Sequence, residues 1–249
     1  MMGQIVKTLA VLLAFGLGQW GFAPAAQAET EPDFAIWDVQ LGLPVVLVPD
    51  SAAAVISCGT KGGPASIELA SFADWAQCPA ETTGLHEVQF SYDDEKDYIA
   101  RALESEYRAL AGGTSIYAHP VVLAILVDNA GLAQGVRIIT DDRVSNNDRR
   151  VAVVLSRNMK VRFGSWGLVC ENIPMKDGEM KVGNEFIHEI CRGTAADGSG
   201  QQVLIEASYL RKKGQDAISK ETQMVNKSYY ESKTWVEITN TPYSPSEAP

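Results

Sequence analysis

Residues 87–140 begin EVQFSYDDEKDYIARALESEYRAL and end HPVVLAILVDNAGLAQGVRIIT, and they decide the fold that we expect. Apolar and polar residues alternate over 88–91, which predicts a strand, whereas apolar residues recur at helical spacing over 93–111. The uninterrupted apolar run 121–127 is typical of a buried strand, and 135–140 is a second strand candidate. The stretch therefore predicts a β-α-β-β unit.

The residues at the ends of these elements agree with this division. Asp93 or Asp94 is placed to cap the predicted helix, and Glu95 puts negative charge in its first turn, where the helix dipole favours an acid. The glycine pair 112–113 allows the helix to end, and residues 128–131 (DNAG) have the composition of a hairpin turn. The last two strands of the unit should therefore form a hairpin.

The chain after this unit predicts one more helix and then strands. Asp148 should cap a helix over 148–163, which Gly164 ends. Strands of alternating polarity follow, joined by turn-rich links, and they predict a four-stranded antiparallel meander. We therefore expect an α+β fold, in which helices pack on antiparallel β-sheet and the β-α-β-β unit is followed by a helix and this meander. The four strands centre on 166–170, 186–191, 203–209 and 230–238.

The N-terminal part of the chain gives weaker signals. The segment AIWDVQL (35–41) predicts a strand, and 67–78 has apolar residues on one side of a possible helix. Residues 43–56 are apolar but interrupted by prolines, so strand and short helix both remain open. The glycine-rich turn 58–64 lacks the residue order of a phosphate-binding loop, and we expect its glycines to ease the backbone around a disulfide.

Residues 1–28 have the features of a secretory signal peptide. A lysine precedes an apolar stretch that is too short to span a bilayer, and an A-x-A cleavage site closes the segment. We expect residues 29–240 to form a single α+β domain, with a possible sub-boundary at 141–147. The proline-containing residues 241–249 are expected to be a disordered tail.

All the cysteines lie in the part that would be exported, where an oxidising compartment favours disulfides. Four cysteines allow three pairings. We favour the two bonds that close short local loops, because loops of about twenty residues each contribute on the order of 3 kcal/mol in the chain-entropy model. The spacing matches neither a C-x-x-C redox motif nor a zinc site. The favoured pairs are Cys58–Cys78 and Cys170–Cys191.

The charge of the chain limits its partners. The formal net charge is −10, and the summed field of an acidic protein repels nucleic acid and anionic lipid. No stretch after the signal peptide approaches a membrane span, so we expect no membrane insertion once the signal peptide is cleaved. The predicted location is outside the cytoplasm, either periplasmic or secreted.

Few residues could carry chemistry. The histidines do not stand in a pattern typical of a catalytic triad or a metal site, so we predict no catalytic residue, no metal and no cofactor. The densest group of carboxylates could support glycan hydrolysis, but helix capping and solvation also explain its position. This group lacks the alternating D-x-D-x-D-G layout of a calcium loop. The candidate site residues are Glu87, Asp93, Asp94 and Glu95.

Aromatic residues offer a second kind of site. They could stack on sugar or peptide, or they could pack in the core, where tryptophan usually lies. The motif F-[AG]-x-W occurs before a cysteine at 72–75 and again at 163–166, which is either a trace of duplication or a coincidence. The aromatic candidates are Trp37, Trp75, Trp166, Trp235, Tyr229 and Tyr230.

Three segments resemble small uncharacterised exported proteins of Gram-negative bacteria. They are the turn 58–64 (CGTKGGP), the junction 88–95 (VQFSYDDE) and the hairpin end 137–141 (RIITD). The resemblance covers most of the chain after the signal peptide and implies a periplasmic protein family without a known activity. The segment 163–166 (FGSW) with Cys170 also looks like the opening of the invasion-associated B-type periplasmic proteins, but it stands at a different place in the chain and no function is carried over.

Together these features favour a non-catalytic exported protein, a binding or accessory module for an unidentified protein, small-molecule or glycan ligand. One alternative is a periplasmic hydrolase that acts on cell-wall or glycan substrates through Glu87, Asp93 or Asp94. Another is a structural or assembly partner in the cell envelope, which would expose an apolar patch.

Overall fold

A computed structural model describes residues 34–95, 99, 113–144, 146–214, 217–218, 225–226 and 229–249. All of these residues belong to one compact unit, residues 31–249. The predicted signal peptide and most of the helix predicted over 93–111 lie outside the described residues.

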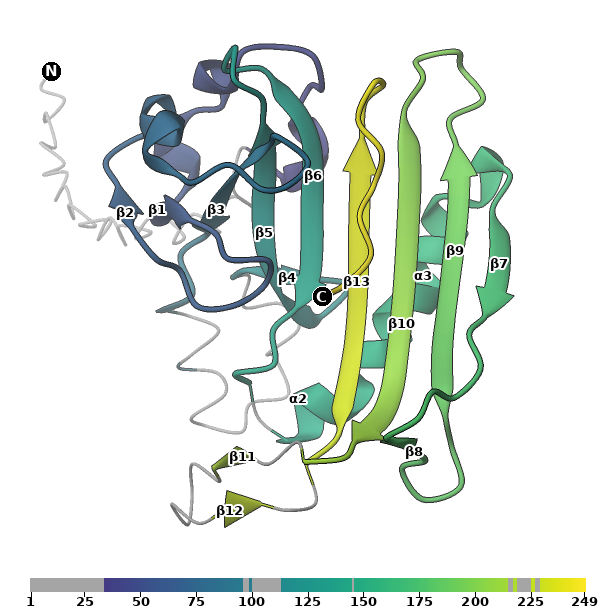
Figure 1. Cartoon of the computed structure of the whole chain (residues 1–249). Helices are drawn as coiled ribbons and strands as arrows, with labels where there is room; N and C mark the ends of the chain where they lie inside the picture. Colours follow the sequence, from purple (N-terminus) through teal and green to yellow (C-terminus); the bar gives the residue numbers. More distant parts are fainter. Residues whose placement is uncertain are drawn as a thin grey trace, which may run out of the picture. The chain divides into compact units, whose positions relative to one another are not determined.

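The described residues form one large antiparallel sheet of eleven strands (Figure 1). Nine strands lie in the order β2-β1-β3-β5-β6-β13-β10-β9-β7, while β4 pairs with β5 and β8 pairs with β10. A separate two-stranded sheet joins β11 (Ala217–Ile218) and β12 (Val225–Asn226). The strands of the large sheet are β1 (Val55–Cys58), β2 (Glu68–Leu69), β3 (His86–Ser91), β4 (Ser115–Ile116), β5 (His119–Val127), β6 (Ala133–Thr140), β7 (Val169–Asn172), β8 (Glu179–Met180), β9 (Ile187–Thr194), β10 (Gln202–Lys212) and β13 (Glu231–Thr239).

The predicted α+β fold of helices packed on a sheet is wrong, because the sheet dominates the described residues. The helix predicted over 148–163 is interrupted: α2 (Asn146–Val151) and α3 (Leu155–Arg162) are separated by the 3-10 turn η6 (Ala152–Val154). Helices of six and eight residues are marginal by themselves. α3 therefore depends on the contacts of Leu155 and Met159 with the apolar core, to which α2 contributes no described residue.

The N-terminal part contains 3-10 turns where the sequence predicts regular elements. The strand predicted over 35–41 and the helix predicted over 67–78 are both wrong, since the first is turn η1 and the second is β2 followed by turn η4. The open segment 43–56 holds two more turns and becomes β1 only at its end. Prolines and tertiary contacts override the weak local periodicity here. The turns are η1 (Ile36–Asp38), η2 (Val45–Leu47), η3 (Asp50–Ala52) and η4 (Phe72–Gln77).

Both disulfides and the remaining strand predictions are confirmed, except that the strand predicted over 166–170 begins only at Val169, because Trp166 lies in a 3-10 turn. β5 and β6 form the predicted hairpin, and the four C-terminal strands are β7, β9, β10 and β13, which are consecutive neighbours in the sheet. Cys58 is bonded to Cys78, and Cys170 is bonded to the directly opposite Cys191 across β7 and β9. Two disulfides fit a protein of an oxidising, extracellular type of compartment.

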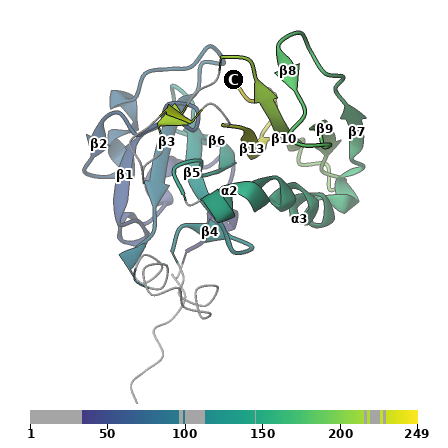
Figure 2. The same ribbon diagram turned by 90° about the horizontal axis from the view of Figure 1, so that it is seen from below.

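One face of the sheet is apolar. A single row across five strands consists of Phe90, Leu123, Ile138, Val236 and Ile205, all of which are buried in one core. Residues of α3 and of the N-terminal turns belong to the same core. Figure 2 shows α2 and α3 along this side of the sheet. We call it the apolar face.

The opposite face is different in chemistry. The adjacent row there consists of Gln89, Ala124, Arg137, Glu237 and Leu204, because neighbouring residues of a strand point to opposite sides. We call it the polar face. The C-terminus lies on this side, away from α2 and α3 (Figure 2).

The sheet consists of two halves with the same strand order. Apart from β2, which lies outside β1 at the edge, one half runs β1, β3, β5, β6 toward the centre and the other runs β7, β9, β10, β13. Each half has one disulfide, and the repeated motif lies in η4 of the first half and around η7 (Gly164–Trp166), just before the second. A further copy of the motif, Phe34–Trp37 at η1, was missed in the sequence. Of the three copies, 34–37 precedes β1 and 163–166 precedes β7, whereas 72–75 lies between β2 and β3, so the two copies that stand before a cysteine do not occupy matched positions.

Candidate functional site

The four candidate carboxylates lie in two separate places. Glu87 is in β3, whereas Asp93, Asp94 and Glu95 follow the far end of that strand. A strand advances about 3.3 Å per residue, so roughly 13 Å separates Glu87 from Ser91, where β3 ends. The four carboxylates therefore do not form one site.

Asp93 and Asp94 make local hydrogen bonds. Asp93 accepts a hydrogen bond from the backbone N–H of Glu95 (2.9 Å), as a helix cap does. Asp94 accepts from the backbone N–H and from the hydroxyl of Thr114, and the Thr114 hydroxyl accepts from the backbone N–H of Tyr92 (2.9 Å). These carboxylates tie the end of β3 to the segment before β4.

Glu87 belongs to a buried cluster around Arg137, which the sequence analysis did not predict. Arg137 Nη1 donates to Glu81 Oε1 (2.6 Å) and to Glu87 Oε2 (2.8 Å). Arg137 Nη2 donates to Glu81 Oε2 (3.1 Å), and Arg137 Nε donates to Glu237 Oε2 (2.8 Å). Arg137 and Glu237 are each only 1% exposed and Glu87 is 2% exposed. A cation so deeply buried is tolerated only because these carboxylates pair with it. We call these four residues the Arg137 cluster.

The glycine-rich turn closes the Arg137 cluster from outside. The backbone N–H of Lys61 donates to Glu87 Oε2 (2.7 Å), and the N–H of Gly59 donates to the main-chain oxygen of Glu87 (2.9 Å). A Cβ at Gly59 would lie 2.4 Å from Glu87 Cδ, so glycine is required for this close approach. The turn therefore serves the cluster as well as the Cys58 disulfide.

The two carboxyl groups that share Arg137 Nη1 differ in pKa. Burial raises the pKa of Glu87, and the charge of Arg137 opposes it only in part. Burial also acts to raise the pKa of Glu81, but the hydrogen bond and charge of Arg137 outweigh it and hold that pKa below its ordinary value. The described hydrogen bonds of the Glu87 carboxyl group are all made by Oε2, and Oε1 has no partner among the described residues. Carboxyl groups with pKa values moved apart are typical of acid–base pairs.

Residues 241–249, for which the sequence predicts disorder, lie on the polar face over the Arg137 cluster, and we call them the tail (Figure 1). The Ser246 N–H donates to Glu237 Oε1 (3.0 Å), and the Ser246 hydroxyl donates to Glu237 Oε2 (2.9 Å). The Ala248 N–H donates to Glu206 Oε2 (2.8 Å). Two buried carboxylates thus accept main-chain donors that lie two residues apart.

Other contacts fix the same part of the tail. Trp235 Nε1 donates to the main-chain oxygen of Ser246 (2.9 Å), and Glu247 forms an ion pair with Arg192. Ala248 packs against a small apolar cluster that includes Trp235 and Leu204. Residues 244–249 are therefore held by side chains of the sheet, and they are not paired as a strand.

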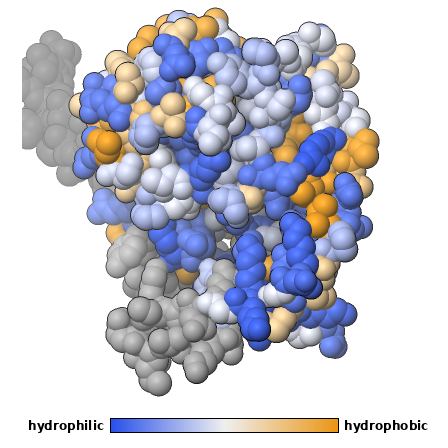
Figure 3. Space-filling model, in the orientation of Figure 1, coloured by the Kyte–Doolittle hydropathy of each residue, from blue (hydrophilic) through white to orange (hydrophobic). Residues whose placement is uncertain are grey.

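A groove of about 560 Å³ lies beside the tail. Val169 of β7 is 75% exposed in it, and Arg192 supplies a partly exposed cation. Among the described residues β7 pairs only with β9, so its outer backbone edge is free. Figure 3 shows apolar atoms gathered over the region of β7 and β9. The groove is lined by Trp166, Gly167, Val169, Arg192, Gly193, Thr194, Gln202, Val203, Leu204, Ser244 and Pro245.

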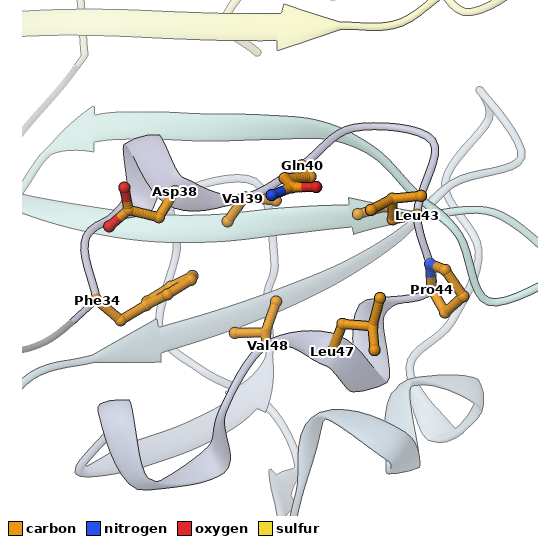
Figure 4. Close-up of a pocket in the computed structure, with 9 residues that line it drawn as sticks. Phe34, Asp38, Val39, Gln40, Leu43, Pro44, Leu47 and Val48 are labelled. Carbon is orange, nitrogen blue, oxygen red and sulfur yellow. The ribbon is translucent and has the colours of Figure 1, made fainter.

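Two smaller cavities lie elsewhere. One of about 130 Å³ lies between η1 and η2, where Phe34, Val48 and Leu47 face the segment around Val39 (Figure 4). The other, of about 210 Å³, lies beside β3 and includes Gln89 and Asp94. Neither adjoins the free edge of the sheet at β7.

One group of possible metal ligands occurs in the described part of the chain: Cys170, Glu189 and Cys191. Both sulfurs are joined to each other in the disulfide, so neither is available as a thiolate ligand. The group therefore gives no metal centre while the bond is intact.

The aromatic candidates have different surroundings. Trp235 is fully buried, with the Arg137 guanidinium carbon 4.8 Å from its ring centre. The Arg149 guanidinium lies over the rings of Tyr229 and Tyr230. Trp37, Trp75 and Trp166 are partly buried against the apolar core, and of the six candidates only Trp166 lines the groove.

No helix in the described ranges has both the length and the apolar composition needed to cross a bilayer. Comparisons with protein-family models, curated proteins and solved structures give no match to this chain. Its function has to be inferred from the geometry of the polar face.

Proposed function

We propose that this protein is an exported, non-catalytic binding or accessory protein of the periplasm, which takes an extended peptide segment of a partner protein in the groove beside the tail. The groove is the observation that carries this proposal, because it combines an apolar side chain, a cation, polar groups and a free strand edge. Extended peptides bind such edges through main-chain hydrogen bonds, and adjacent pockets select their side chains.

The residues of the groove suggest how a segment would bind. All four residues of β7 are exposed, so the backbone of a partner could pair along this strand. Val169 would contact an apolar side chain of the partner, and Arg192, which pairs with Glu247 of the tail, would exchange that carboxylate for an acidic side chain of the partner. The proposed ligand is therefore a peptide of mixed apolar and acidic character.

A second candidate is the hydrolase, and the Arg137 cluster is the observation that favours it. Of the predicted catalytic carboxylates, only Glu87 lies beside another carboxyl group whose pKa is moved in the opposite direction. The tail contacts Arg137 and Glu237 of the cluster, and the glycine-rich turn lies against Glu87, so a substrate would have to displace one of these segments. Turnover of peptidoglycan fragments that is lost in Glu87→Gln would support this candidate.

The binding proposal is tested by selecting peptides from a displayed random library on the exported chain, immobilised through its N-terminal end. Selected peptides should bind the wild type in solution, and Val169→Asp should weaken them at least tenfold because it places a carboxylate in the groove. Val161→Asp is the matched control, since Val161 is 84% exposed on α3 and belongs to no part of the groove. Affinities are measured by isothermal titration calorimetry.

Two outcomes would contradict the proposal. One is a library that yields no binder, and the other is a set of binders that Val169→Asp and Val161→Asp affect equally. Dimerisation that depends on concentration and is lost in Val169→Asp would instead favour the assembly alternative. Sedimentation velocity of the same variants distinguishes this case.

A further inference from the structure

The polar face keeps its charged residues although it is covered. Glu237 and Arg137 are each 1% exposed and Glu206 is 7% exposed, and the tail lies over them. A buried ion pair is seldom more stabilising than well-packed apolar residues of similar volume. A face that stayed covered at all times would therefore gain little from these charges.

Charged residues do have a use on a face that is sometimes uncovered. When the tail leaves, water can solvate the carboxylates of Glu237 and Glu206, and the apolar surface uncovered with them belongs to the small cluster around Trp235 and Leu204; a wholly apolar face would promote aggregation more strongly. The tail is also bonded in the manner of a peptide ligand. Side chains of the sheet accept its main-chain N–H groups, and Trp235 donates to its main-chain oxygen at Ser246.

We propose that the tail is an internal ligand: the polar face binds an extended partner segment with the order Ser–acidic–small, and the tail occupies this place until the partner displaces it. The inference rests on the proposed function of the groove. It adds the chemistry of the ligand and a form of regulation, since the tail lowers the affinity for the partner.

The contacts of the tail define the ligand. A serine gives its N–H and hydroxyl to Glu237, and a small residue two positions later gives its N–H to Glu206. The acidic residue between them pairs with Arg192. Residues before the serine would extend into the groove, where Ser244 and Pro245 of the tail form one wall.

The test uses a chain that folds with its tail and is cut afterwards. A protease recognition sequence is inserted after Asn240, the protein is purified and cut, and a fluorescein-labelled peptide of residues 241–249 is added. The labelled peptide should bind the cut protein at least tenfold more tightly than the uncut protein, as measured by fluorescence anisotropy. Ser246→Pro is a second variant that needs no cleavage, because it removes an N–H donor from the tail. It should bind the labelled peptide at least tenfold more tightly than the wild type.

The peptide itself supplies the matched control. In an extended segment successive N–H groups point to opposite sides. N-methylation at Ser246 or Ala248 should therefore weaken binding at least tenfold, while N-methylation at Glu247 should change it less than threefold. If only the length or the charge of the peptide mattered, the three N-methylated peptides would bind equally.

The inference would be overturned if the cut tail did not exchange with the labelled peptide, if cutting unfolded the protein, or if cut and uncut protein bound the peptide equally. Library peptides that bind cut and uncut protein equally at the groove would overturn the internal-ligand inference and leave the proposed function intact. Exchange of the tail peptide without any library binder would support the internal-ligand inference and contradict the proposed function of the groove.

Discussion

The two faces of the sheet are both covered, yet one is apolar and the other is charged. Ile138 and Arg137 are consecutive residues of β6 and are equally buried, but Ile138 belongs to the apolar core while Arg137 is surrounded by carboxylates. The segments that lie over the two faces also differ in chemistry. The core that lies on Ile138 includes apolar residues of α3, whereas the tail brings hydrogen-bond donors to the side of Arg137.

This difference shows that burial alone does not describe a sheet face. The apolar face is stabilised by removal of apolar area from water, which is independent of exact partners. The polar face is stable only while each buried charge keeps its partners. Truncation in the apolar face should therefore destabilise the protein through lost contacts and the cavity that it leaves, whereas on the polar face the loss of the central cation should destabilise it most.

The largest effect should come from removing the central cation. Arg137→Ala leaves the carboxylates of Glu81, Glu87 and Glu237 without their shared partner, and we expect it to lower the free energy of unfolding by about 3–5 kcal/mol. Urea denaturation followed by circular dichroism measures this change. Arg192→Ala, which removes a partly exposed cation of the same face, should lower it by no more than about 1 kcal/mol. Similar values for both variants would show that the Arg137 cluster is hydrated in solution.

Truncation of a buried side chain of α3, which covers the apolar face, should lower the free energy of unfolding by about 2–5 kcal/mol. Leu155 of α3 is fully buried in the core, so Leu155→Ala removes apolar contacts and leaves a cavity. Val161→Ala in the same helix should change the free energy of unfolding by less than about 0.5 kcal/mol, because Val161 is exposed. If both truncations had the same effect in urea denaturation, α3 would not be the cover of the apolar face.

The sequence indicates on which face of the sheet each charged residue lies, but it does not indicate that these residues are buried. In β6 the charged Arg137 stands between the apolar Val136 and Ile138, and in β13 Glu237 stands between Val236 and Ile238. This alternation places the charges on the opposite face from the core, where a charged residue is normally taken as solvated. Their burial depends on pairing between strands 100 residues apart and on the tail, neither of which local periodicity reveals.

The tail and the helices show two further limits of the sequence. Its prolines do exclude the tail from strand pairing, but they do not prevent side chains of the sheet from binding its backbone. The periodicity over 67–78 suggested a helix, yet the segment is tied by the Cys58–Cys78 bond and forms a strand and a 3-10 turn. The hairpin and the disulfides could be predicted because each depends on residues that are near in sequence.

A smaller effect should come from the pH dependence that Glu87 of the Arg137 cluster gives to the stability. Burial raises the pKa of Glu87 in the folded state, so the folded protein holds a proton that the unfolded chain releases above its ordinary pKa near 4.3. The stability of the wild type should therefore fall as the pH rises from that value through the raised pKa of Glu87.

Glu87→Gln imitates the protonated carboxyl group and should remove this decline. We expect its free energy of unfolding at pH 7 to lie within about 1 kcal/mol of the wild type, or above it. Urea denaturation at several pH values between 4 and 8 measures both curves. Parallel curves for the wild type and the variant would mean that Glu87 is ionised throughout this range and that all three carboxyl groups of the cluster are charged.

The smallest effect on stability should come from the groove, and this is what makes the groove informative. Val169→Asp changes a side chain that is 75% exposed, so its free energy of unfolding should stay within about 0.5 kcal/mol of the wild type. The same change should weaken a bound peptide at least tenfold, because binding buries the side chain that folding leaves in water. A variant that lost stability and binding together would place Val169 in the fold rather than in a binding surface. The polar face would then be permanently covered, as the apolar face is, and the two faces would differ only in composition.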